Sequence, residues 1–320
     1  MRHHTAMNRP CPRPYIGRFA PTPSGPLHAG SLVAALGSWL DARAHGGQWR
    51  VRLDDLDSAR CPAENSRRIL AQLDAHQLIP DAVDRQSHRH AAYAAALQQL
   101  IEQHRVYRCH CRRDALRASG QRTGLVGSLY PGTCRQTPPP ADARCAWRLI
   151  VPEEPIRFTD RLLGTLCQSL PECVGDPILQ RSDGVIAYHL AEVVDNHEFG
   201  ITDVVRGADL AELTPLQLAL HQQLYPTAPP PRYAHLPIVH DAEGRKLSKT
   251  NHAPPLRAEQ AQANLIAAAT HLGLESPTTA RTIPDLLDNW RRQWPQWLDR
   301  HRRTHRATEP AHSDALPPLV

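Results

Sequence analysis

The sequence lacks any uninterrupted apolar stretch long enough to cross a bilayer, so no membrane-spanning helix is expected. Residues 1–14 are basic and rich in proline, and they lack the apolar centre of a secretory signal peptide. Without such a signal, the 8 cysteines are not expected to form a disulfide framework. No internal repeat is present. These absences together predict a cytoplasmic globular protein whose thiols stay reduced.

The composition is that of an ordinary globular enzyme. Hydrophobic residues make up 41% of the 320 residues, which is enough to bury a substantial core, expected in two lobes. The formal net charge of +5 favours contact with a polyanion. Many cytoplasmic enzymes are equally basic, so the charge supports such a partner without establishing it.

A strand, a turn and a helix are predicted near the start of the chain. Residues 15–20 form a short apolar-leaning run that ends in two prolines and a glycine, and the apolar residues beyond it recur with the helical period. The helix should therefore begin at residues 28–31. Its free N–H groups can hold phosphate, Gly25 and Gly30 let a nucleotide approach the backbone, and His28 can donate to a phosphate oxygen. The alternative is an ordinary strand–turn–helix with a surface histidine.

A basic loop is predicted far along the chain. Residues 235–240 form a brief apolar run, residues 241–244 form a turn, and Lys246 and Lys249 follow. Two lysines on such a loop can neutralise the charge that grows on a leaving pyrophosphate. The alternative is a solvated basic loop. Neither segment is a P-loop, and together they indicate ATP-driven adenylation of a carboxylate.

With these segments the chain resembles the class I aminoacyl-tRNA synthetases, in their glutamyl branch. Residues 28–31 (His-Ala-Gly-Ser) are similar to the family's HIGH motif, with serine replacing the last histidine, and residues 246–250 (Lys-Leu-Ser-Lys-Thr) are similar to KMSKS. Residues 18–25 and 204–209 are similar to stretches around the glutamate site. By length the chain most resembles the truncated glutamyl-Q tRNA(Asp) branch. Members of that branch attach glutamate to the queuosine base of tRNA(Asp) and not to a 3′ end.

The resemblance implies an α/β fold, with a Rossmann-like parallel sheet, a zinc-bearing insertion and a short C-terminal helical region. It also implies three sets of site residues. The catalytic set, acting with Mg²⁺, is His28, Lys246 and Lys249. The ATP-binding set is Pro21, Ser24, Gly25, His28, Gly30, Ser31 and Lys249. The glutamate-binding set is Arg18, Ala20, Thr22, Asp54, Tyr188 and Arg206.

An acidic cluster follows the predicted second strand, residues 48–53. Ligands of open parallel sheets sit at the carboxyl ends of strands, so a carboxylate there can bind the substrate's α-ammonium group. The family has glutamate where this chain has Asp54, and the shorter side chain implies a longer or water-mediated contact. For the other two acids, Asp55 and Asp57, the alternative to substrate binding is that they cap or pair with nearby groups of the chain.

Two arginines and a tyrosine are expected around the substrate's side-chain carboxylate. The resemblance makes Arg206 the residue that reads this carboxylate, and the planar guanidinium suits bidentate binding. Arg18 and the Tyr188 hydroxyl would complete the pocket. Alternatively, Arg18 contacts phosphate or lies at the surface, and Tyr188 belongs to the core near an expected strand at residues 185–190.

A metal site is predicted from closely spaced cysteines. Cys109 and Cys111 supply two thiolates and Cys134 a third, which suits tetrahedral zinc. Chemistry alone leaves the fourth ligand open between His110 and Tyr130. The resemblance to glutamyl-Q enzymes implies Cys109, Cys111, Tyr130 and Cys134, with a structural role for Zn²⁺. The alternative is three unliganded cysteines in a reduced protein.

The expected organisation follows the order of these segments. Residues 14–106 form the first half of the catalytic domain, 107–177 the zinc-bearing insertion, and 178–250 the second half. Residues 251–298 form a helical region, with helices at 258–274 and 283–298, the second broken by Pro295, and residues 299–320 a loose tail. Three tryptophans, Trp290, Trp294 and Trp297, are expected to pack the second helix onto the body. No anticodon-binding domain of the full-length type fits after residue 250.

The predicted function is ATP-dependent activation of L-glutamate and its transfer to queuosine in tRNA(Asp). Three alternatives remain: a minimal glutamyl-tRNA synthetase that charges a 3′ end, an adenylyltransferase of the same superfamily that does not use tRNA, and a zinc-bearing RNA-binding module without catalysis. The pocket residues Arg18, Tyr188 and Arg206 favour an amino-acid substrate over the second. His28 and Lys249 disfavour the third.

Overall fold

A computed structural model describes residues 13–112, 114, 122–239, 254–278 and 281–307. Its centre is a parallel sheet with the strand order β12-β11-β1-β2-β3. The strands are β1 (Ile16–Phe19), β2 (Gln48–Leu53), β3 (Ala82–Arg85), β11 (Asp203–Gly207) and β12 (Arg232–Leu236). Because the chain first builds outward from β1 through β2 to β3 and later returns to the other side of β1, the order reverses between β1 and β11. Ligands of such sheets bind at this reversal, beyond the carboxyl ends of the strands.

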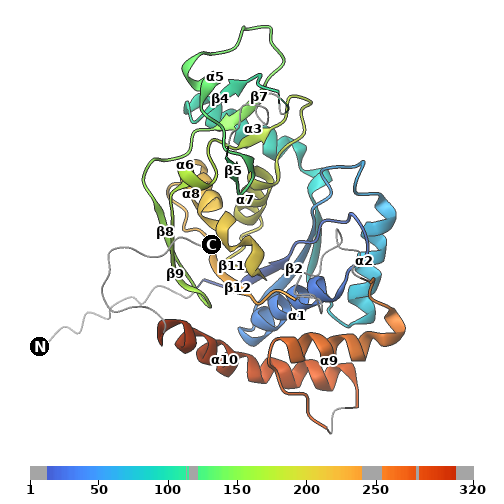
Figure 1. The fold of residues 1–320 in the computed structure, drawn as a ribbon. Coiled ribbons are helices and arrows are strands. Elements are labelled where there is room, and N and C mark those ends of the chain that lie inside the picture. Colours follow the sequence, from blue (N-terminus) through green and yellow to red (C-terminus); the bar gives the residue numbers. More distant parts are fainter. Residues whose placement is uncertain (1–12, 113, 115–121, 240–253, 279–280, 308–320) are drawn as a thin grey trace, which may run out of the picture.

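Helices cover both faces of the parallel sheet (Figure 1). They are α1 (Ala29–Ala44), α2 (Ala63–Ala75), α3 (His90–Glu102), α7 (Tyr188–Glu198), α8 (Thr214–Leu224), α9 (Ala261–His271) and α10 (Ile283–Ala307), with the 3-10 turns η1 (Gln86–His88), η2 (Ala208–Leu213) and η4 (Ala258–Gln260). One hydrophobic core joins the sheet to α1, α2, α9 and α10, and a second joins α3, α7 and α8 to the inserted strands. No helix among the described residues is long and apolar enough to cross a membrane.

Helix α1 forms where the apolar period predicts it. Leu32, Leu36 and Leu40, spaced four residues apart, are almost fully buried against the sheet. The helix begins directly after His28, whose Nδ1 accepts a hydrogen bond from the Ser31 N–H at 3.4 Å. The predicted helix start and the two strands that flank the helix are therefore confirmed.

An inserted region lies between α3 and α7 in the sequence, and its antiparallel sheet is in the upper part of Figure 1. Its three-stranded antiparallel sheet has the order β10-β7-β4, and two hairpins, β5/β6 and β8/β9, accompany it. The elements are β4 (Val106–Cys109), β5 (Thr123–Gly124), β6 (Gly127–Ser128), α5 (Thr133–Gln136), β7 (Ala146–Leu149), β8 (Ile156–Asp160), β9 (Gly164–Gln168), α6 (Leu170–Cys173) and β10 (Ile178–Gln180). The β8/β9 hairpin returns to the main sheet, where the Arg161 N–H donates to the Tyr233 carbonyl at 2.8 Å.

The prediction of a strand at residues 185–190 is wrong. Residue Ile186 forms only an isolated bridge with Gln180, and α7 begins at Tyr188. Leu190 and Val194, four residues apart and fully buried, set the helical period of this segment. A short apolar run is compatible with the period of a strand and with that of a helix. Here the segment is a helix that packs against α3 and α8.

The C-terminal helix also differs from the prediction. Helix α10 continues through Pro295 and ends at Ala307, so it is not broken at Pro295, and residues 299–307 are helical and not part of a loose tail. Proline removes one backbone hydrogen bond, at a cost of about 3 kcal/mol. Burial of three tryptophans on one face, Trp290, Trp294 and Trp297, offsets that cost, and their predicted packing onto the body is confirmed. Residues 308–320 lie outside the described part of the chain.

Candidate active site and metal centre

A cavity of about 230 Å³ lies at the carboxyl ends of β1 and β11, where the strand order reverses. It brings together seven of the residues predicted for the site: Arg18, Ala20, His28, Gly30, Ser31, Tyr188 and Arg206. The predicted residues Pro21, Thr22, Ser24, Gly25 and Asp54 do not line it. Lys246 and Lys249 lie outside the described residues. The cavity therefore unites the start of α1 with the two arginines expected for a carboxylate.

The start of α1 presents donors to this cavity. Because His28 accepts the Ser31 N–H at Nδ1, the neutral imidazole carries its proton on Nε2, which can donate. The helix adds its positive end and its first N–H groups. Such a terminus suits a phosphate group.

The turn from β1 to α1 is fixed by backbone bonds. The Ser24 N–H donates to the Thr22 carbonyl at 2.9 Å, and the Asp54 N–H donates to the Pro21 carbonyl at 3.1 Å. The Asn65 amide donates to the Pro23 carbonyl at 3.1 Å. The turn is thus tied to the end of β2 and to α2 beside the cavity.

Arg206, on β11, is almost fully buried and oriented by three acceptors. Its Nε donates to His235 Nε2 at 3.1 Å, and its Nη2 donates to Thr214 Oγ1 at 2.8 Å and to the Leu210 carbonyl at 3.1 Å. Asp160 holds His235 Nδ1 at 2.6 Å, which fixes the tautomer that accepts at Nε2. Burial lowers the pKa of His235 although Asp160 opposes this, so the ring stays neutral beside the guanidinium.

One N–H group of each pocket arginine has no hydrogen-bond partner among the described residues. These are Arg206 Nη1 and Arg18 Nε, and both are buried. Arg206 Nη1 lies 3.8 Å from Glu192 Oε1, which is beyond hydrogen-bond distance. Since buried donors are normally satisfied, these two groups suit an anionic ligand in the cavity.

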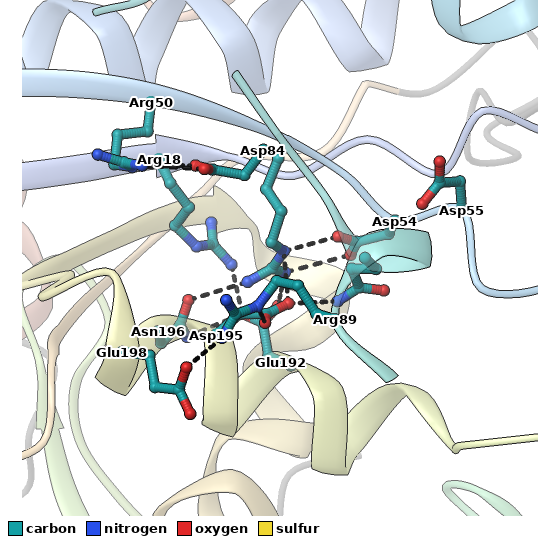
Figure 2. A network of polar contacts seen from close by, with 12 residues as sticks. Arg18, Arg50, Asp54, Asp55, Asp84, Arg89, Glu192, Asp195, Asn196 and Glu198 are labelled. Carbon is teal, nitrogen blue, oxygen red and sulfur yellow. Dashed lines mark hydrogen bonds and ion pairs between the residues drawn. The ribbon is translucent and has the colours of Figure 1, made fainter. Parts of the chain in front are cut away.

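A buried network of charges lies behind the arginines (Figure 2). Glu192, on α7, is fully buried and accepts from Arg18 Nη2 at 2.6 Å, from Asn196 Nδ2 at 3.0 Å and from Arg52 Nη2. Burial alone would raise the pKa of Glu192, but Arg52, Arg18 and Arg206 hold it well below its usual range. Glu192 is therefore an anion that fixes two arginines from different strands.

The structure places Asp54 in this network and outside the cavity wall. Its carboxylate accepts from Arg52 Nε at 2.7 Å and from Arg52 Nη2 at 3.2 Å. Burial, opposed by Arg52, raises the pKa of Asp54 to about 6. Its expected contact with the substrate's ammonium group stays a prediction.

Both other acids pair within the protein, but only Asp57 does so locally, as expected. Asp55 accepts from the N–H and the hydroxyl of Ser87, 32 positions along the chain, at 2.8 and 2.9 Å. Asp57 accepts from Arg60 Nε at 2.7 Å.

Sequence reasoning missed Glu192, Asp160 and His235. The spacing of Tyr188, Glu192 and Asn196 by four residues would have placed all three on one helical face, had the segment been taken as a helix. No local pattern marks Asp160 and His235, which are 75 residues apart in the chain.

Three cysteines of the inserted region form a cluster that suits a metal ion. The sulfur atoms of Cys109, Cys111 and Cys134 all lie within 4.8 Å of one another, with Cys111 and Cys134 at 3.5 Å. Sulfur atoms that share a tetrahedral zinc ion lie at comparable separations, since each Zn–S bond is about 2.3 Å. The residues therefore fit a zinc ion.

Both candidates for a fourth ligand lie beside the cysteines. The Tyr130 hydroxyl is 3.3 Å from Cys111 Sγ and accepts from the Cys134 N–H at 2.9 Å. His110 Nδ1 is 3.5 Å from Cys134 Sγ. Burial and the neighbouring thiols raise the pKa of the Tyr130 phenol, which disfavours a phenolate ligand. Although burial opposes it, hydrogen bonds from Tyr130 and other neighbours lower the pKa of Cys134 to about 6.

Comparison with known proteins identifies the family. Residues 16–264 match the model of the class I tRNA synthetase catalytic domain for E and Q. A glutamyl-Q tRNA(Asp) synthetase of Thiobacillus denitrificans is 48% identical over 282 residues, which cover 87% of this chain and 92% of that protein. One from Ralstonia nicotianae is 47% identical over 272 residues, covering 82% and 85%.

A solved structure supports the same fold. A glutamate tRNA ligase of Elizabethkingia meningosepticum, crystallised with its amino acid, matches with a TM-score of 0.65 and 26% identity over 74% of this chain. The matched part spans about half of that longer enzyme, 52% of its chain. The chain belongs to the class I tRNA synthetases for glutamate and glutamine, in their glutamyl-Q tRNA(Asp) synthetase branch, and is an aminoacyl-tRNA ligase.

Proposed function

We propose that this protein activates L-glutamate with ATP and transfers the glutamyl group to the queuosine base of tRNA(Asp), in the cytoplasm. The observation that carries the proposal is the cavity whose lining contains both the first residues of α1 and two buried arginines, each with an unsatisfied N–H group. One end of such a cavity suits a carboxylate and the other suits a phosphate. The names of the relatives supply the acceptor, tRNA(Asp).

The glutamate end is assigned to residues of three elements. Arg206 binds the side-chain carboxylate, with Arg18 and the Tyr188 hydroxyl beside it. The backbone at Ala20 and Thr22 and the carboxylate of Asp54 complete the amino-acid set. Asp54 reaches the ammonium group through water, because it lies outside the cavity lining while Arg52 donates to both of its oxygens.

The ATP end is assigned to the turn and the helix start. His28, Gly30 and Ser31 contact phosphate, with Pro21, Ser24 and Gly25 in the preceding turn. Lys246 and Lys249, in their own loop, stabilise the leaving pyrophosphate. Mg²⁺, when bound with ATP, supplies further neutralisation of the phosphate charge.

The reaction proceeds in two displacement steps. A glutamate α-carboxylate oxygen bonds to the α-phosphorus of ATP while the bond to the pyrophosphate oxygen breaks, and pyrophosphate leaves. A hydroxyl of the modified nucleoside then bonds to the carbonyl carbon, AMP leaves with the electron pair, and the hydroxyl proton passes to water. The residues on the cavity walls orient the reactants and stabilise developing charge.

The test is ATP–pyrophosphate exchange with a panel of amino acids, with and without tRNA. We expect exchange that depends on glutamate and needs no tRNA, followed by glutamylation of queuosine-containing tRNA(Asp). Exchange only with tRNA, together with acylation of an unmodified tRNA, would instead support a minimal glutamyl-tRNA synthetase. No exchange with any amino acid would exclude both functions.

Zinc binding gives a separate prediction. Replacing Cys134 by alanine removes one of three clustered thiolates, so we expect bound zinc, measured by elemental analysis, to fall from about one ion per chain to well below half. Cys167→Ala is the control, because Cys167 is a free cysteine on β9, away from the cluster. Equal zinc in both variants would mean that the cluster holds no metal.

A further inference from the structure

The inserted region places one buried carboxylate behind the arginine assigned to glutamate. The β8/β9 hairpin lies against β12, the edge strand of the parallel sheet (Figure 1). Its Asp160, the last residue of β8, is almost fully buried and does not line the cavity. It is joined to Arg206 through the side chain of His235, on β12. A residue of the insertion therefore contributes to the glutamate end of the site from outside it.

The hairpin is held in one register against β12. The Arg161 N–H donates to the Tyr233 carbonyl at 2.8 Å, and two residues further along each segment meet again, where the His235 N–H donates to Asp160 Oδ1 at 3.3 Å. The Arg161 guanidinium also donates from Nη1 to Asp203 Oδ1 at 3.2 Å, on the neighbouring strand β11. Because these contacts fix the turn, the carboxylate of Asp160 has a fixed position relative to the imidazole of His235.

The two oxygens of Asp160 have separate roles. Oδ1 accepts from the N–H groups of Leu162 and Leu163, both at 2.9 Å, and from the N–H of His235. Oδ2 accepts from His235 Nδ1 at 2.6 Å. Burial alone would raise the pKa of Asp160, but His235 and the backbone N–H groups lower it, so the carboxylate is an anion. Three N–H groups therefore hold Oδ1, and Oδ2 is left for the imidazole.

His235 transmits this polarity to the arginine. With its proton on Nδ1, the neutral ring has a lone pair on Nε2, which accepts from Arg206 Nε at 3.1 Å and lies 3.3 Å from Thr214 Oγ1. The other tautomer would place an N–H against the N–H of Arg206 Nε, and two donors cannot bond to each other. The guanidinium therefore keeps all of its bonds only with the tautomer that Asp160 selects.

We propose that Asp160 is a positioning residue for the amino-acid substrate: it selects the His235 tautomer that accepts from Arg206, and so it holds the guanidinium at the rotation that leaves Nη1 for a substrate carboxylate. The unsatisfied N–H of Arg206 Nη1 is the group that this rotation makes available. The inference rests on the proposed function and adds a residue of the inserted region to it. Asp160 acts through His235 and does not touch the substrate.

Asp160→Asn tests the selection of the tautomer with almost no change of shape. Its amide oxygen should take the place of Oδ1, where three N–H groups need an acceptor, so its NH₂ group faces His235 Nδ1. The imidazole proton must then lie on Nε2, opposite Arg206 Nε. We expect kcat/KM for glutamate in ATP–pyrophosphate exchange without tRNA to fall about 10- to 100-fold, with the KM for ATP unchanged within about twofold.

Asp203→Asn is the matched control. Asp203 is also a fully buried aspartate that holds the hairpin, but its side chain bonds to Arg161, Thr202 and Arg232 instead of His235. The substitution removes the same charge and makes the same change of shape. A general loss of stability would act on both aspartate variants, so we expect the glutamate kinetics of this control to change little.

The tautomer can also be observed directly. Nitrogen NMR of protein labelled in its histidine rings distinguishes a protonated from an unprotonated Nε2, and His235→Gln identifies the signal of His235 by its loss. We expect an unprotonated Nε2 in the unsubstituted protein and a protonated Nε2 in Asp160→Asn. A purely structural role of Asp160 would not move this proton.

Two substitutions at His235 keep the test valid if Asp160→Asn does not fold. His235→Gln retains a donor for Asp160 and an acceptor for Arg206, whereas His235→Leu retains neither. We expect His235→Gln to keep kcat/KM for glutamate within about fivefold and His235→Leu to lose about 10- to 100-fold.

Three results would overturn the inference. They are equal glutamate kinetics in the two His235 variants, unchanged glutamate kinetics in Asp160→Asn after the proton has moved to Nε2, and equal losses in Asp160→Asn and Asp203→Asn. Failure of the proposed function would appear differently, as missing glutamate-dependent exchange in the unsubstituted protein.

Discussion

Replacing Arg206 by methionine is expected to lower kcat/KM for glutamate in ATP–pyrophosphate exchange by about 10³-fold. The guanidinium is oriented by His235, Thr214 and the Leu210 carbonyl, which leaves Nη1 for the substrate carboxylate. Methionine fills similar volume and offers no donor, so the substrate's negative charge would be buried without its main partner. The KM for ATP should change little, because ATP is assigned to the start of α1.

Two further variants make the Arg206 experiment specific. Lysine at position 206 keeps the charge but cannot make a bidentate contact, so a loss of about 10²-fold is expected. Arg232→Met is the matched control, since Arg232 is a largely exposed arginine on the neighbouring strand β12 and pairs with Asp203 outside the cavity. Unchanged glutamate kinetics in Arg206→Met would show that a different group binds the carboxylate. Arg18 would then be the first candidate.

The parts of the site predicted from sequence are those whose residues are close together in the chain. The strand, turn and helix around His28 follow from a change of period within one short segment, and the structure confirms them. The cysteine cluster was predicted because thiolates separated by one residue, with a third nearby, have few other uses in a reduced protein. Local spacing is sufficient in both cases.

The missed parts depend on contacts between distant segments. Glu192 reaches Arg18 across 174 positions and Arg52 across 140, so no local pattern identifies their pairing. The strand expected at residues 185–190 ends before Glu192, so the sequence prediction does not place Glu192 on the same element as Tyr188. Helix α10 is a similar case. Local propensity predicts a break at Pro295, whereas packing of three tryptophans against the core prevents it.

Removing the Asp41 carboxylate is expected to lower stability strongly, because this group joins α10 to the rest of the protein. It is fully buried on α1 and accepts from Arg161 Nη2 at 2.9 Å and Trp294 Nε1 at 2.8 Å, with the Tyr15 hydroxyl as a further donor. We expect Asp41→Ala to lower the free energy of unfolding by about 3–5 kcal/mol, measured by urea denaturation, because the buried Arg161 loses its main counter-charge. Trp294→Phe removes the donor and replaces the buried indole by a smaller ring, so it should cost at least about 1.5–3 kcal/mol.

The pH dependence of the Asp41 contribution has a definite sign. Burial alone would raise the pKa of Asp41, but the hydrogen bond and charge of Arg161, with Tyr15 and Trp294, hold it below the usual value. The contribution is therefore present above the unfolded pKa of about 3.9 and is lost as pH falls through the folded-state pKa. Asp288→Ala, which removes a partly exposed acid on α10 that pairs with Arg291, is the control and should leave the urea midpoint nearly unchanged. If Asp41→Ala behaved like this control, the tryptophans alone would anchor α10, and the polar contacts of Asp41 would add nothing to that anchor.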